Sequence, residues 1–184
     1  HVDFVVGPIF SNILVAIHKP VIDAGKILIS TNAGTSNFAG AACSPNFFVT
    51  SYQNDQIYEA IGAAANKLGY KRVYALVPNY PAGKDAIAGF KRTYKGEIVE
   101  ESLVPLNTTD FAPEVSKISA SKPDALFTFM PGGLGINLLN TFIQAGLKDK
   151  LPVISAFTAD EATLPVLKDN AVGIYGVLTW APNM

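Results

Sequence analysis

The chain has 184 residues, of which 49% are hydrophobic and 16% are charged, so it can bury one or two sizeable cores and is not mainly disordered. Its 14 Lys and Arg residues are balanced by 15 Asp and Glu residues. Because there is no basic surplus to collect phosphates, nucleic acid is not expected as a partner.

Predicted strands and helices alternate from the first residues onward. Short apolar runs predict strands over residues 2–8, 26–30, 47–49, 72–77, 97–104, 124–129, 153–155 and 173–178. Helix-like apolar spacing falls between them, over residues 11–24, 54–68, 82–94, 110–119, 135–145 and 160–167. A glycine follows three of these helices, as a left-handed helix end requires: Gly25, Gly69 and Gly146. The alternation predicts an α/β fold with doubly wound parallel sheets.

The stretch from residue 35 to residue 46 breaks this rhythm with glycine, proline and small polar residues. It is interpreted as a loop that leads into a crossover strand at 47–49, with a domain boundary near residue 50. Residues 1–50 are then the end of a first lobe with one crossing, residues 51–178 a second lobe, and residues 179–184 the start of the next crossing. Because the chain opens inside a strand and stops just after one, we expect it to be a fragment.

Strand-to-helix turns are where a ligand is expected, because open α/β sheets bind ligands beyond the carboxyl ends of their strands. Ser11 and Asn12 begin a helix, where free backbone N–H groups and the helix dipole favour an anion such as a carboxylate. An equally weighted interpretation is that either residue only caps its own helix. Ala33, Gly34 and Thr35 lie in a second turn whose small residues let a ligand approach the backbone.

Later turns supply candidate residues for the opposite wall of a cleft. Tyr80 offers an aromatic platform, Met130 and Pro131 an apolar turn, and Phe157 a further ring after the next strand. Each aromatic side chain is as readily a packing residue as a ligand contact. The glycines at 132, 133 and 135 lack the GxGxxG spacing, so a nucleotide is not expected.

No pattern in the sequence indicates catalysis. His18 lies within a predicted helix and His1 at the first position, so no histidine follows a strand end as a catalytic triad needs. The nucleophile-elbow and HExxH motifs are absent. The single cysteine, Cys43, excludes an internal disulfide and a cysteine-rich zinc site. We therefore expect neither an enzyme nor a bound cofactor or metal.

Five short motifs, in this order, resemble the substrate-binding proteins of bacterial ABC importers. They are Val-Gly-Pro-x-x-Ser at 6–11, Ile-Ser-x-Asn-Ala-Gly at 29–34, Phe-x-Thr-Ser-x-Gln-Asn-Asp at 48–55, Asn-Tyr-Pro-Ala-Gly at 79–83 and Thr-Asp-Phe-Ala-Pro at 109–113. The similarity covers essentially the whole chain and is to the type I periplasmic-binding-protein fold, in its leucine/isoleucine/valine-binding branch. It implies two α/β lobes joined by three crossings, with the ligand held between them.

The resemblance also implies roles for the candidate residues. Ser11, with Phe10 beside it, looks like the serine that hydrogen-bonds the ligand carboxylate, and residues 33–35 like a loop that offers donors to the same ligand. Tyr80 matches an aromatic residue of the second lobe. Met130 and Pro131 fall where amino-acid binders often carry a tyrosine.

The segment from Ser155 to Thr158 falls where amino-acid binders carry an acid for the ligand ammonium. Ala156 and Phe157 have no charge there, and Asp160 comes several residues late, although a small alignment shift brings it nearer. A carboxylate anchor without an ammonium partner suits an aromatic or aliphatic carboxylic acid. The Asn-Ala-Gly and Ser-Pro-Asn-Phe-Phe stretches also look like a subgroup associated with aromatic acids.

The expected function is therefore that of a periplasmic solute receptor, monomeric at full length, which delivers a small carboxylate to an ABC permease in the membrane. Branched-chain amino acid binding by the same fold and a ligand-sensing domain of a receptor or regulator are the alternatives. An α/β hydrolase whose catalytic residues lie elsewhere is a third.

Overall fold

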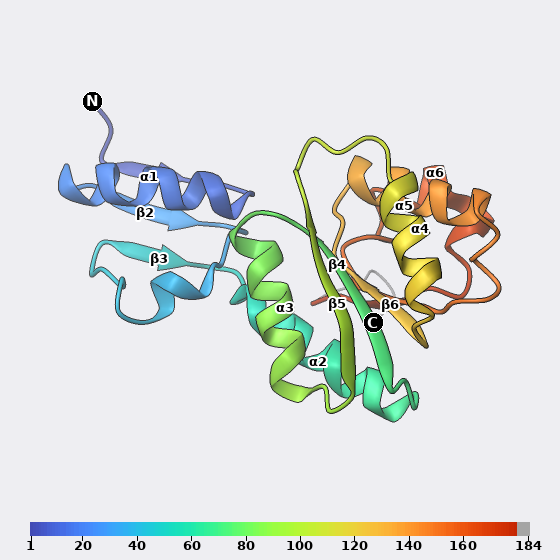
Figure 1. Cartoon of the computed structure of the whole chain (residues 1–184). Coiled ribbons are helices and arrows are strands. Elements are labelled where there is room, and N and C mark those ends of the chain that lie inside the picture. The colour runs from blue at the N-terminus through green and yellow to red at the C-terminus, as the bar shows by residue number, and fades with distance from the viewer. Residues whose placement is uncertain (180–184) are drawn as a thin grey trace.

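The computed structural model describes residues 1–179 and divides the chain between two parallel sheets (Figure 1). Residues 1–49 form what we call the first lobe and residues 54–179 the second lobe. Residues 50–53 connect them. Of the predicted next crossing at 179–184, all but Thr179 lies outside the described residues.

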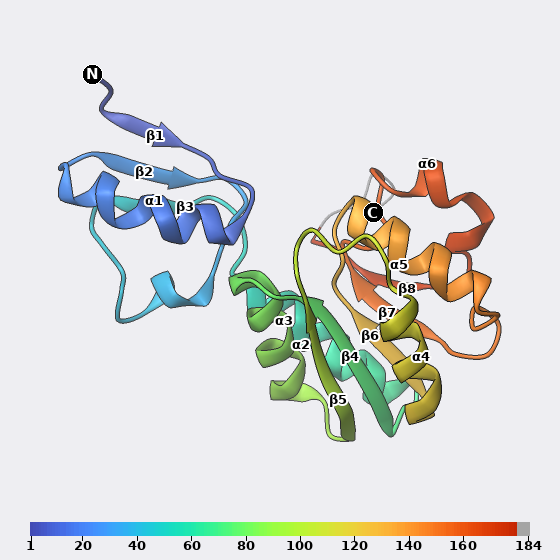
Figure 2. The same cartoon turned by 45° about the horizontal axis from the view of Figure 1, so that its top comes forward.

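The first lobe has a three-stranded parallel sheet in the order β1-β2-β3. Its elements are β1 (Phe4–Val6), α1 (Ser11–Asp23), β2 (Ile27–Ser30), the 3-10 helix η1 (Ser36–Ala39) and β3 (Phe47–Val49). Helix α1 lies along one face of the sheet (Figure 2), where Leu14 and Leu28 are fully buried. Because β3 pairs with β2, residues 47–49 belong to the first sheet, and the crossing starts only after them.

The second lobe has a five-stranded parallel sheet in the order β5-β4-β6-β7-β8. Its strands are β4 (Arg72–Pro78), β5 (Glu97–Val104), β6 (Ala125–Thr128), β7 (Val153–Ala156) and β8 (Tyr175–Val177). Its helices are α2 (Asn54–Lys67), α3 (Pro81–Thr93), α4 (Ala112–Ser121), α5 (Gly133–Gln144), α6 (Leu164–Leu167) and the 3-10 helix η2 (Lys168–Ala171). The alternation of parallel strands and helices confirms the predicted α/β fold with doubly wound sheets.

Alternation along the strands builds two cores, one on each face of the second sheet. On β4, Val73, Ala75 and Val77 pack with α2 and α3, whereas Tyr74 and Leu76 pack with α4 and α5. Successive side chains of a strand point to opposite faces, so a strand buried on both faces must be apolar throughout. That explains the continuous apolar sequence of β4.

The strand order reverses between β4 and β6, which neighbour each other although β5 lies between them in sequence. In doubly wound sheets such a switch point opens a crevice at the carboxyl ends of the strands. The turns that follow β4, β6 and β7 therefore face this crevice, as the sequence predicts.

Helix ends match the prediction closely in most places. The three predicted glycine ends have positive φ angles, 68° at Gly25, 81° at Gly69 and 69° at Gly146. The helix predicted over 160–167 is wrong in its first half, since α6 covers only Leu164–Leu167. The Asp160 side chain accepts the backbone N–H groups of Ala162 and Thr163 and holds a turn there instead. None of the helices within residues 1–179 is long and apolar enough to cross a membrane.

Candidate functional site

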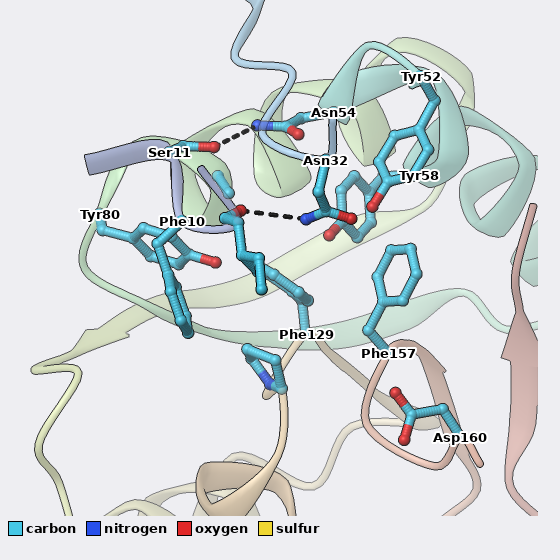
Figure 3. A pocket seen from close by; sticks show the side chains of 13 residues that line it. Phe10, Ser11, Asn32, Tyr52, Asn54, Tyr58, Tyr80, Phe129, Phe157 and Asp160 are labelled. Atoms are coloured by element: carbon cyan, nitrogen blue, oxygen red, sulfur yellow. Dashed lines mark hydrogen bonds between the residues drawn. The ribbon is translucent and has the colours of Figure 1, made fainter. Parts of the chain in front are cut away.

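A cavity of about 210 Å³ lies between the two lobes, beside the carboxyl ends of their strands (Figure 3). It is smaller than the roughly 300–1,000 Å³ typical of sites for drug-sized ligands, so it suits a small molecule. Residues of both lobes and of the connection line it: Ile9, Phe10, Ser11, Asn32, Tyr52, Asn54, Tyr58, Tyr80, Ala82, Phe129, Pro131, Phe157 and Asp160.

Aromatic rings form a continuous wall around this cavity. The ring centroid of Phe10, in the first lobe, lies 6.3 Å from that of Tyr80. Tyr80 in turn stacks on Phe129 with 6.1 Å between ring centroids. Phe129 meets the edge of Phe157 at 6.2 Å, and Phe157 stacks on Tyr52 of the connection at 5.8 Å. Such a wall favours a flat apolar ligand, because rings gain from offset and edge contacts beyond simple burial.

Two polar side chains, Ser11 and Asn54, meet at one end of the cavity, at the start of α1. Ser11 is the first residue of that helix and is 2% exposed. No side chain caps α1, so the interpretation of Ser11 or Asn12 as a cap of its own helix does not hold. The Ser11 hydroxyl instead accepts a hydrogen bond from the Asn54 side-chain amide at 3.0 Å (Figure 3). The Ser11 hydroxyl keeps its own proton, and beside the positive end of a helix it can donate that proton in a hydrogen bond to an anion.

Two further polar residues line the cavity at other places. Asn32 donates from its side-chain amide to the carbonyl oxygen of Ile9 at 3.0 Å, which fixes the turn between β1 and α1. Asp160 stands away from Ser11, below Phe157 in Figure 3. One oxygen of its carboxylate accepts the turn N–H groups, and the second has no protein donor among the described contacts.

The tyrosines of the cavity stay neutral over a wide pH range. Burial raises the pKa of Tyr52, of Tyr58 and of Tyr80, and the nearby Asp85 carboxylate raises the last two further. Their hydroxyls therefore remain both donors and acceptors for a bound molecule.

The structure brings together five of the ten predicted ligand-binding residues. Phe10, Ser11, Tyr80, Pro131 and Phe157 all line the cavity. The other five do not line it: Asn12, Ala33, Gly34, Thr35 and Met130. Whether any of the ten binds ligand stays a prediction.

Three of the five outlying residues belong to the turn after β2. Ala33 is buried in the first-lobe core, and Gly34 and Thr35 border a separate hollow beside Tyr52. The turn after β2 does permit a close approach to its backbone, but the group that approaches it is the chain's own connection between the lobes. Gly34 accepts the Asn54 N–H at 2.8 Å, and a Cβ at Gly34 would collide with the Tyr52 carbonyl oxygen.

Met130 and Asn12 point elsewhere. Met130 is fully buried in the core under α4 and α5, and its N–H donates to the Thr158 hydroxyl at 2.9 Å. Its neighbour Phe129 faces the cavity in its place. Asn12 borders an adjoining hollow with Ile13 and Leu134.

Tyr52, Asn54 and Tyr58 are the main cavity residues that the sequence analysis did not select. They lie on the connection and the first turns of α2, not after a strand of the second lobe. The motif at 48–55 contains two of them, and the polar run Gln53-Asn54-Asp55 before an apolar helix was the available signal. Among residues 1–179, no three His, Cys, Asp or Glu side chains cluster as a metal site.

Known proteins resemble this chain along its full length. A family model described as periplasmic binding protein matches residues 1–184. The Leu/Ile/Val-binding protein homolog 6 of Brucella melitensis is 30% identical over 171 residues, which cover 88% of this chain and 43% of that protein. The chain thus spans less than half the length of this curated relative.

Solved structures give the same result. A solute binding protein of an ABC transporter from R. palustris, in complex with benzoate, superposes with a TM-score of 0.92 at 28% identity, covering 99% of this chain and 51% of that one. A second, from Rhodopseudomonas palustris BisB5 with 3,4-dihydroxy benzoic acid, has a TM-score of 0.85 at 35% identity, covering 94% and 48%.

A third neighbour shares the fold at lower identity. It is the branched-chain amino acid transporter substrate binding protein of Streptococcus pneumoniae in complex with isoleucine, with a TM-score of 0.84 at 22% identity, covering 100% of this chain and 53% of that one. The matched family, the curated relative and these folds agree with the motifs of the sequence. The chain belongs to the periplasmic binding protein family, with the type I fold of ABC-transporter solute-binding proteins.

Proposed function

We propose that this chain forms part of the solute-binding component of an ABC importer and holds a small carboxylate in the cavity between its lobes. The observation that carries the proposal is the Ser11 hydroxyl at the start of α1, next to a continuous aromatic wall. A hydroxyl donor and a helix N-terminus stabilise an anionic group, and the rings enclose an apolar body.

An aromatic acid is the ligand class that this cavity supports best. The five rings from Phe10 to Tyr52 offer flat surfaces, and the cavity is small. Relatives at 28% and 35% identity hold benzoate and 3,4-dihydroxy benzoic acid. Binding without covalent chemistry, location in the periplasm and delivery to a membrane permease follow from the family and are part of the proposal, as is a monomeric whole protein.

A branched-chain amino acid is the second candidate, favoured by one specific observation. Asp160 lines the cavity, so a ligand ammonium group would find a carboxylate partner there. In the sequence, Asp160 comes several residues after the position of the ammonium-binding acid in amino-acid binders, although a small alignment shift brings it nearer, and its side chain lines the cavity.

A thermal-shift screen of the whole protein separates the two candidates. One panel holds benzoate and hydroxybenzoates, and the other holds leucine, isoleucine and valine. A ligand that binds only the folded state raises the melting temperature by mass action. Shifts from the aromatic acids alone support the first candidate. Shifts from the amino acids that disappear in Asp160→Asn support the second.

Ser11→Ala tests the anchor itself. We expect the affinity for the stabilising carboxylate to fall by about 1–3 kcal/mol, the cost of one missing hydrogen bond to a charged group. Isothermal titration calorimetry measures it. Ser116→Ala, on the exposed surface of α4 where the hydroxyl bonds only the Ala112 carbonyl, is the matched control. Equal affinities in the two variants would contradict the role of Ser11.

A further inference from the structure

A chain of hydrogen bonds runs from the first lobe through the second lobe and back to Ser11. The Asp85 carboxylate of α3 accepts the Ser36 hydroxyl at 2.9 Å and the Ser36 N–H at 3.3 Å. It also accepts the Asn54 side-chain amide at 3.0 Å, and the same amide donates to the Ser11 hydroxyl at 3.0 Å. Ser11, Asn54 and Asp85 are each at least 91% buried.

The orientation of the Asn54 side chain is fixed by its neighbours. Its oxygen accepts the Gly34 N–H at 3.3 Å, and its nitrogen faces Asp85 and Ser11. A flipped amide would point its oxygen at the Asp85 carboxylate and its NH2 group at the Gly34 N–H, leaving both contacts repulsive. A carboxylate that only accepts and a backbone amide that only donates therefore allow a single orientation.

This orientation determines what Ser11 can offer to a ligand. A hydroxyl has one proton and two lone pairs. Both protons of the Asn54 amide are donated, one to Asp85 and one to Ser11, so the Ser11 oxygen acts as an acceptor toward Asn54. Its own proton is left for a group in the cavity that it lines.

We propose that Asn54 and Asp85 are positioning residues that make Ser11 a hydrogen-bond donor toward the cavity, and so select a carboxylate over the corresponding carboxamide. The inference rests on the proposed function, in which the ligand carboxylate lies at Ser11. A carboxylate oxygen can only accept from Ser11. A carboxamide can also accept through its oxygen, but as a neutral group it forms a weaker hydrogen bond with the same donor.

Exchanging the two residues tests this selection without changing the net charge. In the double variant Asn54→Asp, Asp85→Asn, the carboxylate moves next to Ser11 and Gly34, and both now donate to it. The new amide donates to that carboxylate, and its oxygen keeps the Ser36 hydroxyl as a partner, while the Ser36 N–H loses the oxygen that it shared with Asn54. The Ser11 lone pairs then face the cavity in place of its proton.

Benzoate and benzamide are the probes, because they differ only in the group placed at Ser11. Calorimetric titration of the whole protein gives the ratio of their dissociation constants. We expect the exchange to reduce the preference for benzoate by about 10- to 100-fold, the factor that corresponds to one charge-assisted hydrogen bond. Ser36→Ala, which removes a partner of Asp85 without touching Asn54 or Ser11, is the matched control and should leave the ratio unchanged.

Repeating the exchange in the Ser11→Ala background separates positioning from direct repulsion. If Asn54 and Asp85 act through Ser11, the exchange should change the ratio there by no more than about twofold, the usual deviation for independent sites. An equally large change in both backgrounds would overturn the inference, because the relocated carboxylate would then repel benzoate directly.

Two other outcomes distinguish the failure of this inference from that of the proposed function. If Ser11→Ala weakens benzoate binding and the exchange leaves the ratio unchanged, the anchor stands and the positioning role is wrong. If Ser11→Ala itself leaves benzoate binding unchanged, the anchor is wrong and the positioning role is lost with it. Asp85→Asn alone provides a second variant should the exchange disturb folding. It should lower the preference for benzoate, because only the Gly34 N–H then still favours the native orientation of the Asn54 amide.

Discussion

Helices cover both faces of the second sheet, whereas α1 covers only one face of the first sheet. On the uncovered side of the first sheet, Phe4, Val6 and Phe48 are 58%, 65% and 52% exposed. In the second lobe, every residue of β6 and β7 is buried. Parallel sheets are normally covered on both faces. Within the described residues, the second lobe therefore has most of the apolar core. The first lobe supplies Ser11, and polar contacts such as Ser36 with Asp85 and Ser11 with Asn54 join it to the second lobe.

The largest expected effect is the difference in stability between a change in the second-lobe core and a change on the exposed face of the first sheet. Phe127 is fully buried and stacks on Phe90 at 4.3 Å. We expect Phe127→Ala to lower the free energy of unfolding by about 3–5 kcal/mol, through lost burial and the cavity left behind. Phe48→Ala, in the first sheet, should cost less than about 1 kcal/mol. Urea denaturation followed by circular dichroism compares the two. Similar costs would show that the face around Phe48 is covered in the folded protein.

A smaller effect is expected where the lobes meet. A Cβ on Gly34 would collide with the Tyr52 carbonyl oxygen, so Gly34→Ala must push the connection away from the turn after β2. We expect a loss of about 1–3 kcal/mol in the free energy of unfolding, together with weaker carboxylate binding. Gly133→Ala in the second lobe is the control, since nothing lies within 4 Å of its Cβ position. Equal behaviour of the two variants would mean that this contact does not hold the lobes.

The second lobe should lose stability at alkaline pH. Burial and the neighbouring Tyr80, Tyr52 and Asp85 raise the pKa of Tyr58 well above its ordinary value near 10. Because the folded state favours neutral Tyr58, this residue contributes to the free energy of unfolding. The contribution is complete below about pH 10 and is lost as the pH rises toward the folded-state pKa. Tyr58→Phe should flatten part of the decline in the melting temperature above pH 10. An unchanged decline would contradict this assignment.

The stability of the first lobe should fall at acid pH instead of alkaline pH, and this is the smallest effect that we expect. It contains no tyrosine, and His18 stacks on Phe38 at 4.0 Å and meets the edge of Phe47 at 5.0 Å. Burial lowers the pKa of His18, so its contribution to stability is present above about pH 6.5 and is lost as the pH falls through the folded-state pKa. Hydrogen exchange at β2 should become faster at acid pH relative to β6, and His18→Phe should remove this difference.

The sequence predicts strongly where local patterning decides the structure. The strand over Glu97–Val104 was predicted residue for residue, and Gly25, Gly69 and Gly146 marked three helix ends. Tyr80 and Phe157 could be selected because a turn after a parallel strand faces the crevice whatever the other lobe does.

The sequence predicts the site poorly where a shift of one residue along a strand, or a contact between the lobes, determines which side chain faces the cavity. Met130 was selected in place of Phe129, although neighbouring side chains at a strand end point to opposite sides, so a shift of one residue moves the side chain from the cavity into the core. Asn54 was missed because the hydrogen bonds that hold its side chain at the cavity are to Gly34 and Asp85, which are 20 and 31 residues away. The helix expected from residue 160 failed because Asp160 bonds its own turn, a local competitor that apolar spacing does not reveal.

The connection at residues 50–53 also ties the two lobes together at the Ser11 end of the cavity. It is pinned at both ends, by the Thr50 N–H on the Ser30 carbonyl oxygen at 3.0 Å and by the Asn54 N–H on that of Gly34 at 2.8 Å. Asn54, which makes the second of these contacts, also donates to the Ser11 hydroxyl. A ligand held by Ser11 would therefore lie next to the segment that joins the lobes.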